Sequence, residues 1–276
     1  MKKHLSTVIL ILVFLVGLSL LLYPAVSDYW NSLHQSRAIA GYVEEVQNMD
    51  EQRYKQIVDA ASAYNLEFAK TGNTFLLSEE QREAYNRQLN ISGNGIMGYL
   101  DIPEISCYVP LYHGTSEEVL QVGAGHMEGT SLPIGGVNSH SVLSGHRGLP
   151  SARLFTDLDK MRVGDTFTIH VLNEILTYQV YEIVTVLPHE VDTLKIEAGR
   201  DLCTLVTCTP YGVNTHRLLV KAERIENAEQ AVTVRVVSDA VQIDSVIVAS
   251  LLAVPMLLVL MIILLLQPKK RKKELS

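Results

Sequence analysis

Cysteine is scarce in this chain: there are three among 276 residues, and no cysteine or histidine spacing matches a zinc site. Three cysteines do not form a disulfide framework. Pairing Cys107 with Cys203 would leave Cys208 free, and the sequence alone does not establish that pair. No stretch has the spacing of an EF-hand loop, and there is no internal repeat or low-complexity segment. These absences exclude repeat proteins and small disulfide-stabilised scaffolds, and they give no reason to expect a cofactor.

Positive charge is also scarce away from the two ends. Setting aside Lys2, Lys3, the five basic residues at 269–273 and Glu274 leaves 16 of the 23 basic residues and 29 of the 30 acidic ones, a net charge of about −13. No run of basic residues with interleaved aromatics provides a track for phosphates. The composition therefore predicts an acidic domain with no nucleic-acid partner.

Long hydrophobic runs, in contrast, occupy both ends of the chain. Residues 5–23 and 246–266 are each long enough to cross about 30 Å of hydrocarbon as a helix. The first run lacks a convincing small-x-small cleavage site, which favours a retained anchor over a secretory signal peptide. We therefore expect two transmembrane helices held in the lipid membrane.

Basic residues beside these runs predict the topology. Lys2 and Lys3 precede the first run, and the five basic residues at 269–273 follow the second. Because basic flanks stay on the cytoplasmic side, both termini are expected in the cytoplasm and roughly residues 26–245 outside. The sequence thus predicts a two-pass protein of the cell membrane with an extracellular domain.

A helical region follows the first anchor. Apolar residues recur at helical spacing from about residue 25 to 64, and charged residues fill the other face. Ser78 and Gln81 then carry the signature of a capping box, which begins a second helix reaching about residue 89. We expect this region, residues 26–95, to form a helical stalk or lid region packed on a core.

Strands dominate from Gly98 onward, separated by turns rich in proline and glycine. Two short helices are expected, one starting at Thr115 and one over 151–161, and Asn173-Glu174 is expected to form a two-residue hairpin turn. The candidate strands are residues 99–102, 107–112, 141–144, 165–172, 175–187, 202–208 and 217–224. Seven strands at this spacing predict a mostly β fold with a closed or nearly closed barrel. The expected domains are an anchor (1–25), the helical region (26–95), the barrel (96–233), a linker with the second span (234–268) and a cytoplasmic tail (269–276).

Cys208 lies at the end of a predicted buried strand. The strand stops there because Pro210 cannot donate to a ladder and Gly212 marks a turn. The next apolar run begins just past Arg217, so the simplest geometry is a hairpin with Cys208 and Arg217 at the same end, about 5 Å apart at Cα. A neighbouring cation favours the thiolate and so a nucleophile. From spacing alone, a small buried core cysteine is the alternative.

A cysteine nucleophile needs a partner that handles protons, and the chain has nine histidines. His146 follows the apolar run Val142-Leu143 directly after a glycine, which predicts a strand end in a tight loop. Spacing alone favours His146 over His140 and His216 only slightly.

Motifs along the chain are similar to those of a known family. The stretch Thr204-Leu-Val-Thr-Cys208 resembles the TLxTC motif of sortases, the cysteine transpeptidases of Gram-positive cell envelopes. Further stretches resemble the class C, pilin-polymerising branch: 23–31, 112–120, 129–136, 144–158, 208–217 and the C-terminal span. The resemblance thus covers nearly the whole chain from Tyr23 to the basic tail.

This resemblance implies a sortase-type barrel and three site residues: Cys208 as nucleophile, His146 as acid and base, and Arg217 as the cation that stabilises substrate or oxyanion. It also implies that the enzyme cleaves an LPxTG-like sorting signal between Thr and Gly and transfers the acyl group to a lysine amine of a pilin subunit. A sortase that attaches surface proteins to cell-wall precursor, a hydrolytic cysteine peptidase and a non-catalytic envelope scaffold are the alternatives.

The segment 69–78 departs from the class C pattern. Class C sortases usually carry a lid before the barrel, with an Asp-Pro-aromatic or similar anchor over the cysteine. This segment has no proline and no Asp-aromatic pair. Phe75 is the candidate lid residue, and packing within the helical collar is the alternative role for its side chain.

Overall fold

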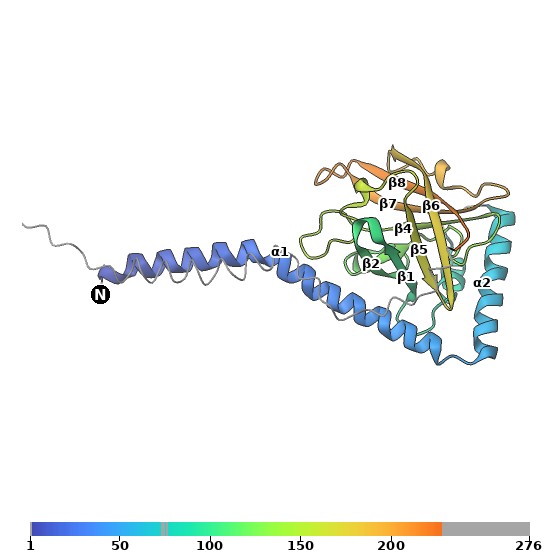
Figure 1. Cartoon of the computed structure of the whole chain (residues 1–276), viewed down its shortest axis with the longest axis horizontal. Helices are drawn as coiled ribbons and strands as arrows, with labels where there is room; N and C mark the ends of the chain where they lie inside the picture. Colours follow the sequence, from blue (N-terminus) through green and yellow to red (C-terminus); the bar gives the residue numbers. More distant parts are fainter. Residues whose placement is uncertain (1, 73–74, 76, 228–276) are drawn as a thin grey trace, which may run out of the picture. The chain divides into compact units, whose positions relative to one another are not determined.

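The structure is a computed structural model that describes residues 2–72, 75 and 77–227 (Figure 1). The chain divides into two compact units, whose described parts are residues 2–26 and residues 27–227. The predicted second transmembrane helix and the basic tail lie outside the described residues.

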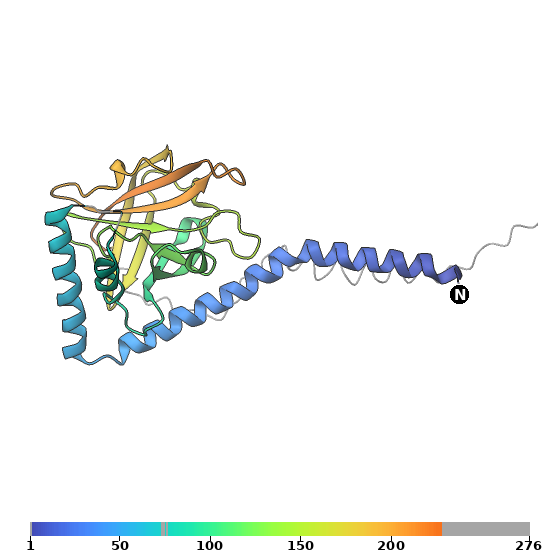
Figure 2. The same cartoon turned by 180° about the vertical axis from the view of Figure 1, so that it is seen from behind.

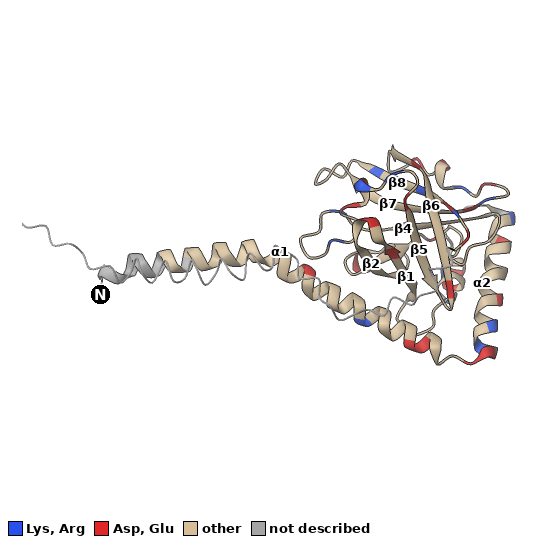
Figure 3. Ribbon diagram, in the orientation of Figure 1, with Lys and Arg blue, Asp and Glu red and all other residues tan. Residues whose placement is uncertain are grey.

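The described part of the first unit is the beginning of helix α1 (Lys2–Gln47). Within the part of the chain that the structure describes, one helix is long and apolar enough to cross a membrane, at Val13–Gln47. A signal sequence near the N-terminus passes the same test. The ribbon of residues 10–27 shows no charged residue in Figure 3, as the sequence requires. The structure therefore has one apolar N-terminal helix that suits an anchor or a signal.

In the larger unit, the rest of α1 is followed by α2 (Glu51–Thr71) and α3 (Glu79–Asn86). The prediction of one helix to about residue 64 was wrong, because the chain breaks at Asp50. The Asp50 carboxylate accepts a hydrogen bond from the Arg53 backbone N–H at 2.8 Å and caps a new helix. The capping box of Ser78 and Gln81 is confirmed, with hydrogen bonds of 3.2 and 2.8 Å, although α3 ends three residues earlier than expected.

These helices pack against the barrel, and Figure 2 shows α2 running along one side of it. The Tyr42 hydroxyl of α1 donates to the carbonyl of Met97 at 3.0 Å. Asn65 of α2 makes two hydrogen bonds with the backbone of Leu132, at 2.7 and 3.0 Å. Because these buried amide and hydroxyl groups are paired, they fix the helices on the barrel at little cost in desolvation.

Eight strands close into a barrel in the order β1-β2-β3-β4-β7-β8-β6-β5. The strands are β1 (Ile96–Ile102), β2 (Cys107–His113), β3 (Ala124–His126), β4 (Ser139–Ser144), β5 (Thr166–Val171), β6 (Glu174–Val186), β7 (Asp201–Thr209) and β8 (His216–Arg224). All seven predicted strands are present, so the closed, mostly β barrel is confirmed. Strand β3 was missed because three residues are too few for a detectable alternation.

Three local predictions were wrong. Residues 151–161 do not form an α-helix: only a 3₁₀ turn, η2 (Leu158–Lys160), is present, and the positive φ of Leu154 (37°) is incompatible with a helix. Helix α4 (Glu117–Leu120) has Ser116 as its N-cap, one residue later than expected, without a side-chain capping bond. The hairpin loop between β5 and β6 is Leu172-Asn173, because Val171 pairs with Glu174.

Alternation along the strands sorts side chains between the barrel interior and its outer face. In β7, Cys203 and Leu205 belong to the interior core, whereas Val206 belongs to a separate apolar cluster with residues of β4 and β8. This outer cluster matters for the site, because Cys208 lies two residues beyond Val206 and shares its face.

Candidate active site

Cys208 and Arg217 are directly paired at one end of the antiparallel strands β7 and β8. This confirms the predicted hairpin geometry. The Arg217 guanidinium donates to the backbone carbonyls of Asn214 and His216, at 3.2 and 3.1 Å. The cation is therefore held at the turn that joins the two strands, beside the cysteine.

The three cysteines differ in exposure. All are free thiols, but Cys107 and Cys203 are buried, whereas Cys208 is partly exposed. Burial raises the pKa of Cys107 to about 12 and also raises that of Cys203. Neither buried thiol forms a useful population of thiolate near neutral pH, so Cys208 is the nucleophile candidate among the three.

His146 reaches the same end of the barrel from β4. Strands β4 and β7 are parallel and in register, with Ser144 opposite Val206. The Thr207 hydroxyl continues this contact by donating to the Gly145 carbonyl at 2.7 Å. His146 and Cys208 each lie two residues past the Ser144–Val206 pair, His146 in the loop that follows β4 and Cys208 on β7. The three predicted site residues thus sit at the ends of three neighbouring strands.

The loop that carries His146 is closely packed. The His146 carbonyl accepts a hydrogen bond from the Phe155 backbone N–H at 3.1 Å. A Cβ on Gly145 would lie 2.6 Å from the Phe155 ring, so only glycine fits there. Arg147 binds the Asp159 carboxylate at 2.5 Å and the Thr209 hydroxyl at 3.3 Å. The residues next to His146 are thereby tied to the residue next to Cys208.

Glu117 is a neighbour that sequence reasoning missed. Its Oε2 lies 3.3 Å from the Nε2 of His146, and it comes from α4. The Gln121 amide, and then His146, hold the pKa of the Glu117 carboxyl below its usual value. The resemblance had drawn attention to residues 112–120, but nothing in their spacing shows that this helix faces the loop of His146.

An apolar floor adjoins Cys208, formed by Val142 of β4, Val206 of β7 and Leu219 of β8. Leu194, from the segment between β6 and β7, is buried against it. Partly buried side chains complete the cluster: Phe75, Met127, Val184, Val186 and Val191. Sequence analysis did not find this floor, because its strands meet only through the barrel topology.

Within the described residues, no group of three or more His, Cys, Asp and Glu side chains is arranged to hold a metal ion. His126, for example, is fully buried and bonded to the Tyr85 hydroxyl (2.9 Å) and the Ser131 carbonyl (2.8 Å), which gives it a role in packing.

A model of the sortase domain matches residues 100–225. The crystal structure of sortase C1 from Streptococcus agalactiae is 55% identical, covers 70% of this chain and all of its own, and superposes with a TM-score of 0.68. The chain belongs to the sortase family. Sortases are transpeptidases, and this one has class C sortases among its structural neighbours.

Two further sortase C structures extend this finding. Sortase C of Streptococcus pneumoniae, described with its pilin substrate specificity, is 42% identical, with 69% of this chain and 97% of its own covered and a TM-score of 0.60. Clostridium perfringens sortase C, solved with its C-terminal cell wall sorting motif, is 41% identical, with 70% and 100% covered and a TM-score of 0.62. The sortase barrel found here is therefore common to class C enzymes from several species.

Proposed function

We propose that this sortase cleaves an LPxTG-like sorting signal through a thioester on Cys208 and transfers the acyl group to a lysine amine of a pilin subunit, building covalent pili. The observation that carries the proposal is the convergence of Cys208, Arg217 and His146 at the ends of β7, β8 and β4. The pilin and sorting-motif substrates named for the S. pneumoniae and C. perfringens relatives support the choice of substrate.

Each residue has a step in this chemistry. The Cys208 thiolate attacks the Thr carbonyl carbon, and protonated His146 donates its proton to the glycine nitrogen as the C–N bond breaks. The Arg217 guanidinium donates to the carbonyl oxygen while negative charge develops on it. The lysine amine then attacks the thioester and gives its proton to His146. An amide bond forms, and the thiolate is released.

The apolar floor supports binding of the signal. The leucine of an LPxTG-like peptide lies a few residues before the scissile bond. Val206 lies two residues before Cys208 on β7, so the two side chains share one face of the strand. Val142 and Leu219 belong to the same cluster and, like Val206, are buried beneath the side chains packed on them. An apolar side chain of the peptide would therefore reach this cluster by replacing one of the covering side chains. Phe75 packs against the same floor, and we propose that it acts as a lid that the peptide displaces.

The proposal also includes a location. The apolar start of α1 would anchor the enzyme in the cell membrane, and the sequence supports a second anchor within residues 234–268 and a cytoplasmic tail at 269–276. The barrel, residues 96–233, and the helical region, residues 26–95, would then lie outside the cell with both termini in the cytoplasm. The substrates would meet the site on that side.

Mass spectrometry tests the chemistry. The full-length protein in detergent is incubated with an LPxTG peptide, first alone and then with a pilin that supplies lysine. We expect an acyl adduct on Cys208 that is lost when the pilin is added, with appearance of a peptide–pilin amide. Cys208→Ala should form no adduct, whereas Cys107→Ser, at a buried thiol, should retain it.

Other products would contradict parts of the proposal. Absence of any acyl adduct on Cys208 would contradict the proposal that the protein acts through a thioester. Release of the free acid at an equal rate with and without pilin would indicate a peptidase. Transfer to a cell-wall precursor amine in preference to the pilin would indicate the cell-wall-attaching alternative.

A further inference from the structure

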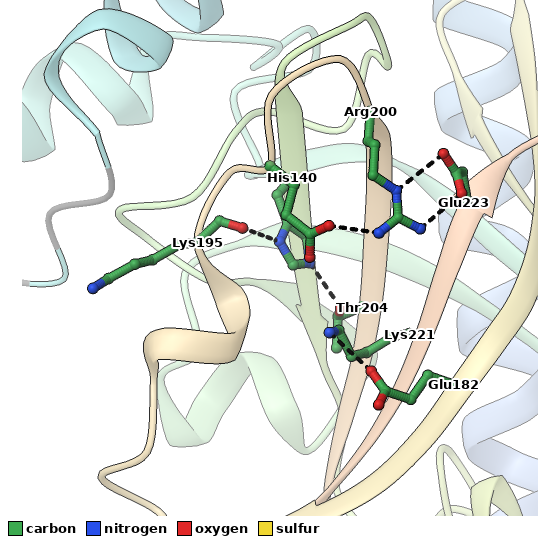
Figure 4. Close-up of polar contacts among 8 residues, drawn as sticks. His140, Glu182, Lys195, Arg200, Thr204, Lys221 and Glu223 are labelled. Carbon is green, nitrogen blue, oxygen red and sulfur yellow. Dashed lines mark hydrogen bonds and ion pairs between the residues drawn. The ribbon is translucent and has the colours of Figure 1, made fainter.

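His140 is a fully buried histidine outside the proposed catalytic group (Figure 4). It lies on β4, two residues before Val142 of the apolar floor. Its Nδ1 is 2.8 Å from the carbonyl oxygen of Lys195, and its Nε2 is 2.7 Å from the hydroxyl of Thr204 on β7. One ring thus joins the sheet to the segment that connects β6 with β7.

The two partners fix the tautomer of the ring. A carbonyl oxygen can only accept, so Nδ1 must carry the hydrogen and donate to Lys195. Nε2 is then free to accept the hydrogen of the Thr204 hydroxyl. Both bonds are satisfied by the neutral ring, and the Lys195 side chain takes no part, since it points away in Figure 4.

The segment held in this way covers the apolar floor. Lys195 directly follows the 3₁₀ turn η3 (Asp192–Leu194). Leu194 is buried on the floor, and Val191 is packed against the same cluster. The bond from His140 to the Lys195 backbone therefore sets how closely Leu194 lies over the floor beside Cys208.

Charged groups surround the ring on several sides. Lys221 of β8 is bonded to Glu182 of β6 at 3.0 Å. Arg200, at the start of β7, is bonded to Glu223 of β8 at 2.7 Å and to Glu197 at 2.5 Å. The two cations already have carboxylate partners, so a proton on His140 would add an unpaired positive charge to a buried site.

We propose that neutral His140 is a positioning residue that clamps the β6–β7 segment, residues 187–200, over the apolar floor and so sets the affinity for the sorting signal. This inference rests on the proposed function, which supplies the sorting signal as the substrate. It acts on binding and not on the bond-breaking step, because His140 lies on the far side of the floor from Cys208 and touches neither Cys208 nor His146.

A pair of substitutions separates the two bonds of the ring. The amide nitrogen of Asn overlays Nδ1 of histidine, so His140→Asn keeps a donor for the Lys195 carbonyl. The longer His140→Gln reaches towards Thr204 and loses the clamp. His189→Gln is the matched control, because His189 lies in the same segment and is exposed.

Steady-state kinetics with an LPxTG peptide and a saturating amine give the first readout. We expect His140→Gln to raise KM about tenfold, the factor that loss of one buried hydrogen bond carries, with kcat within about twofold. His140→Asn and His189→Gln should keep the wild-type KM.

Equal KM values for His140→Asn and His140→Gln would overturn the proposed clamp. A decrease in kcat of His140→Gln without a rise in its KM would also overturn it. Hydrogen exchange provides a test that needs no turnover: residues 187–200 should exchange faster in His140→Gln than in His140→Asn or His189→Gln. If the wild type forms no Cys208 adduct, the proposed function is wrong. The hydrogen-exchange result still tests whether His140 holds residues 187–200, because it does not depend on turnover. Equal exchange in all three variants would contradict it.

Discussion

At the scale of single residues, the contact between Glu117 and His146 leads to a prediction. The Glu117 carboxylate lies 3.3 Å from the His146 imidazole and orients the ring that donates to the leaving amine in the proposed mechanism. The Glu117 side chain is 64% exposed, so solvent screens the pair and its effect is moderate. We expect Glu117→Gln to lower kcat about two- to fivefold, because an exposed contact of this kind has a small effect.

Salt and a neighbouring carboxylate provide the controls. High salt should reduce the kcat of the wild type more than that of Glu117→Gln, because only the wild type has the exposed ion pair. Glu118→Gln, one residue further along α4, should behave like the wild type. Equal losses in the two variants would show that Glu117 acts through the stability of α4 and not through His146.

The same residues show what sequence can and cannot predict at this scale. The pairing of Cys208 with Arg217 was predictable, because each residue borders an apolar run and a short turn joins the runs. His146 needed the family resemblance, since other histidines also border strands. Glu117 could not be predicted, because its contact depends on how α4 packs beside β3, which no local pattern encodes.

At the scale of elements, the segment between α2 and α3 brings Phe75 to the apolar floor. If this side chain is a lid, its removal frees the surface beside Cys208. We expect Phe75→Ala to raise the rate of peptide cleavage and of Cys208 alkylation by iodoacetamide several-fold, about the effect of removing 1 kcal/mol of covering contact. Leu77→Ala, two residues further on, is the control, because Leu77 packs on the barrel core instead. Equal rates for the wild type and Phe75→Ala would exclude a lid at Phe75.

Elements were predicted well where apolar runs and turn residues agreed, as in the seven strands. Residues 151–161 show the limit of this reasoning. Leu154, Phe155, Leu158 and Met161 are all buried, as their spacing predicted, yet the backbone forms turns. The spacing reports which side chains face the core, but Gly145 and Phe155 need a tight loop there, and tertiary packing overrides the helical pattern.

At the scale of the whole molecule, buried neutral histidines connect stability to pH. Burial lowers the pKa of His126 to about 4, and burial also lowers the pKa of His113 and His140. In the unfolded chain these groups take up protons below about pH 6.5. Between that pH and the lower folded values the unfolded state binds more protons, so the free energy of unfolding falls as the pH falls.

We expect the free energy of unfolding to be insensitive to these histidines above pH 7 and to decrease by about 3 kcal/mol between pH 6.5 and 4 from His126 alone. Burial raises the pKa of Asp201, which opposes this trend, because a carboxyl that is protonated more readily in the fold favours folding at low pH. Chemical denaturation followed by circular dichroism, at pH values from 7.5 to 4.5, measures the slope. His126→Gln should have a lower stability at pH 7 but a shallower slope, whereas His189→Gln, at an exposed site, should keep the slope of the wild type. A wild-type stability that stays constant down to pH 4.5 would contradict the assignment of neutral histidines to the core.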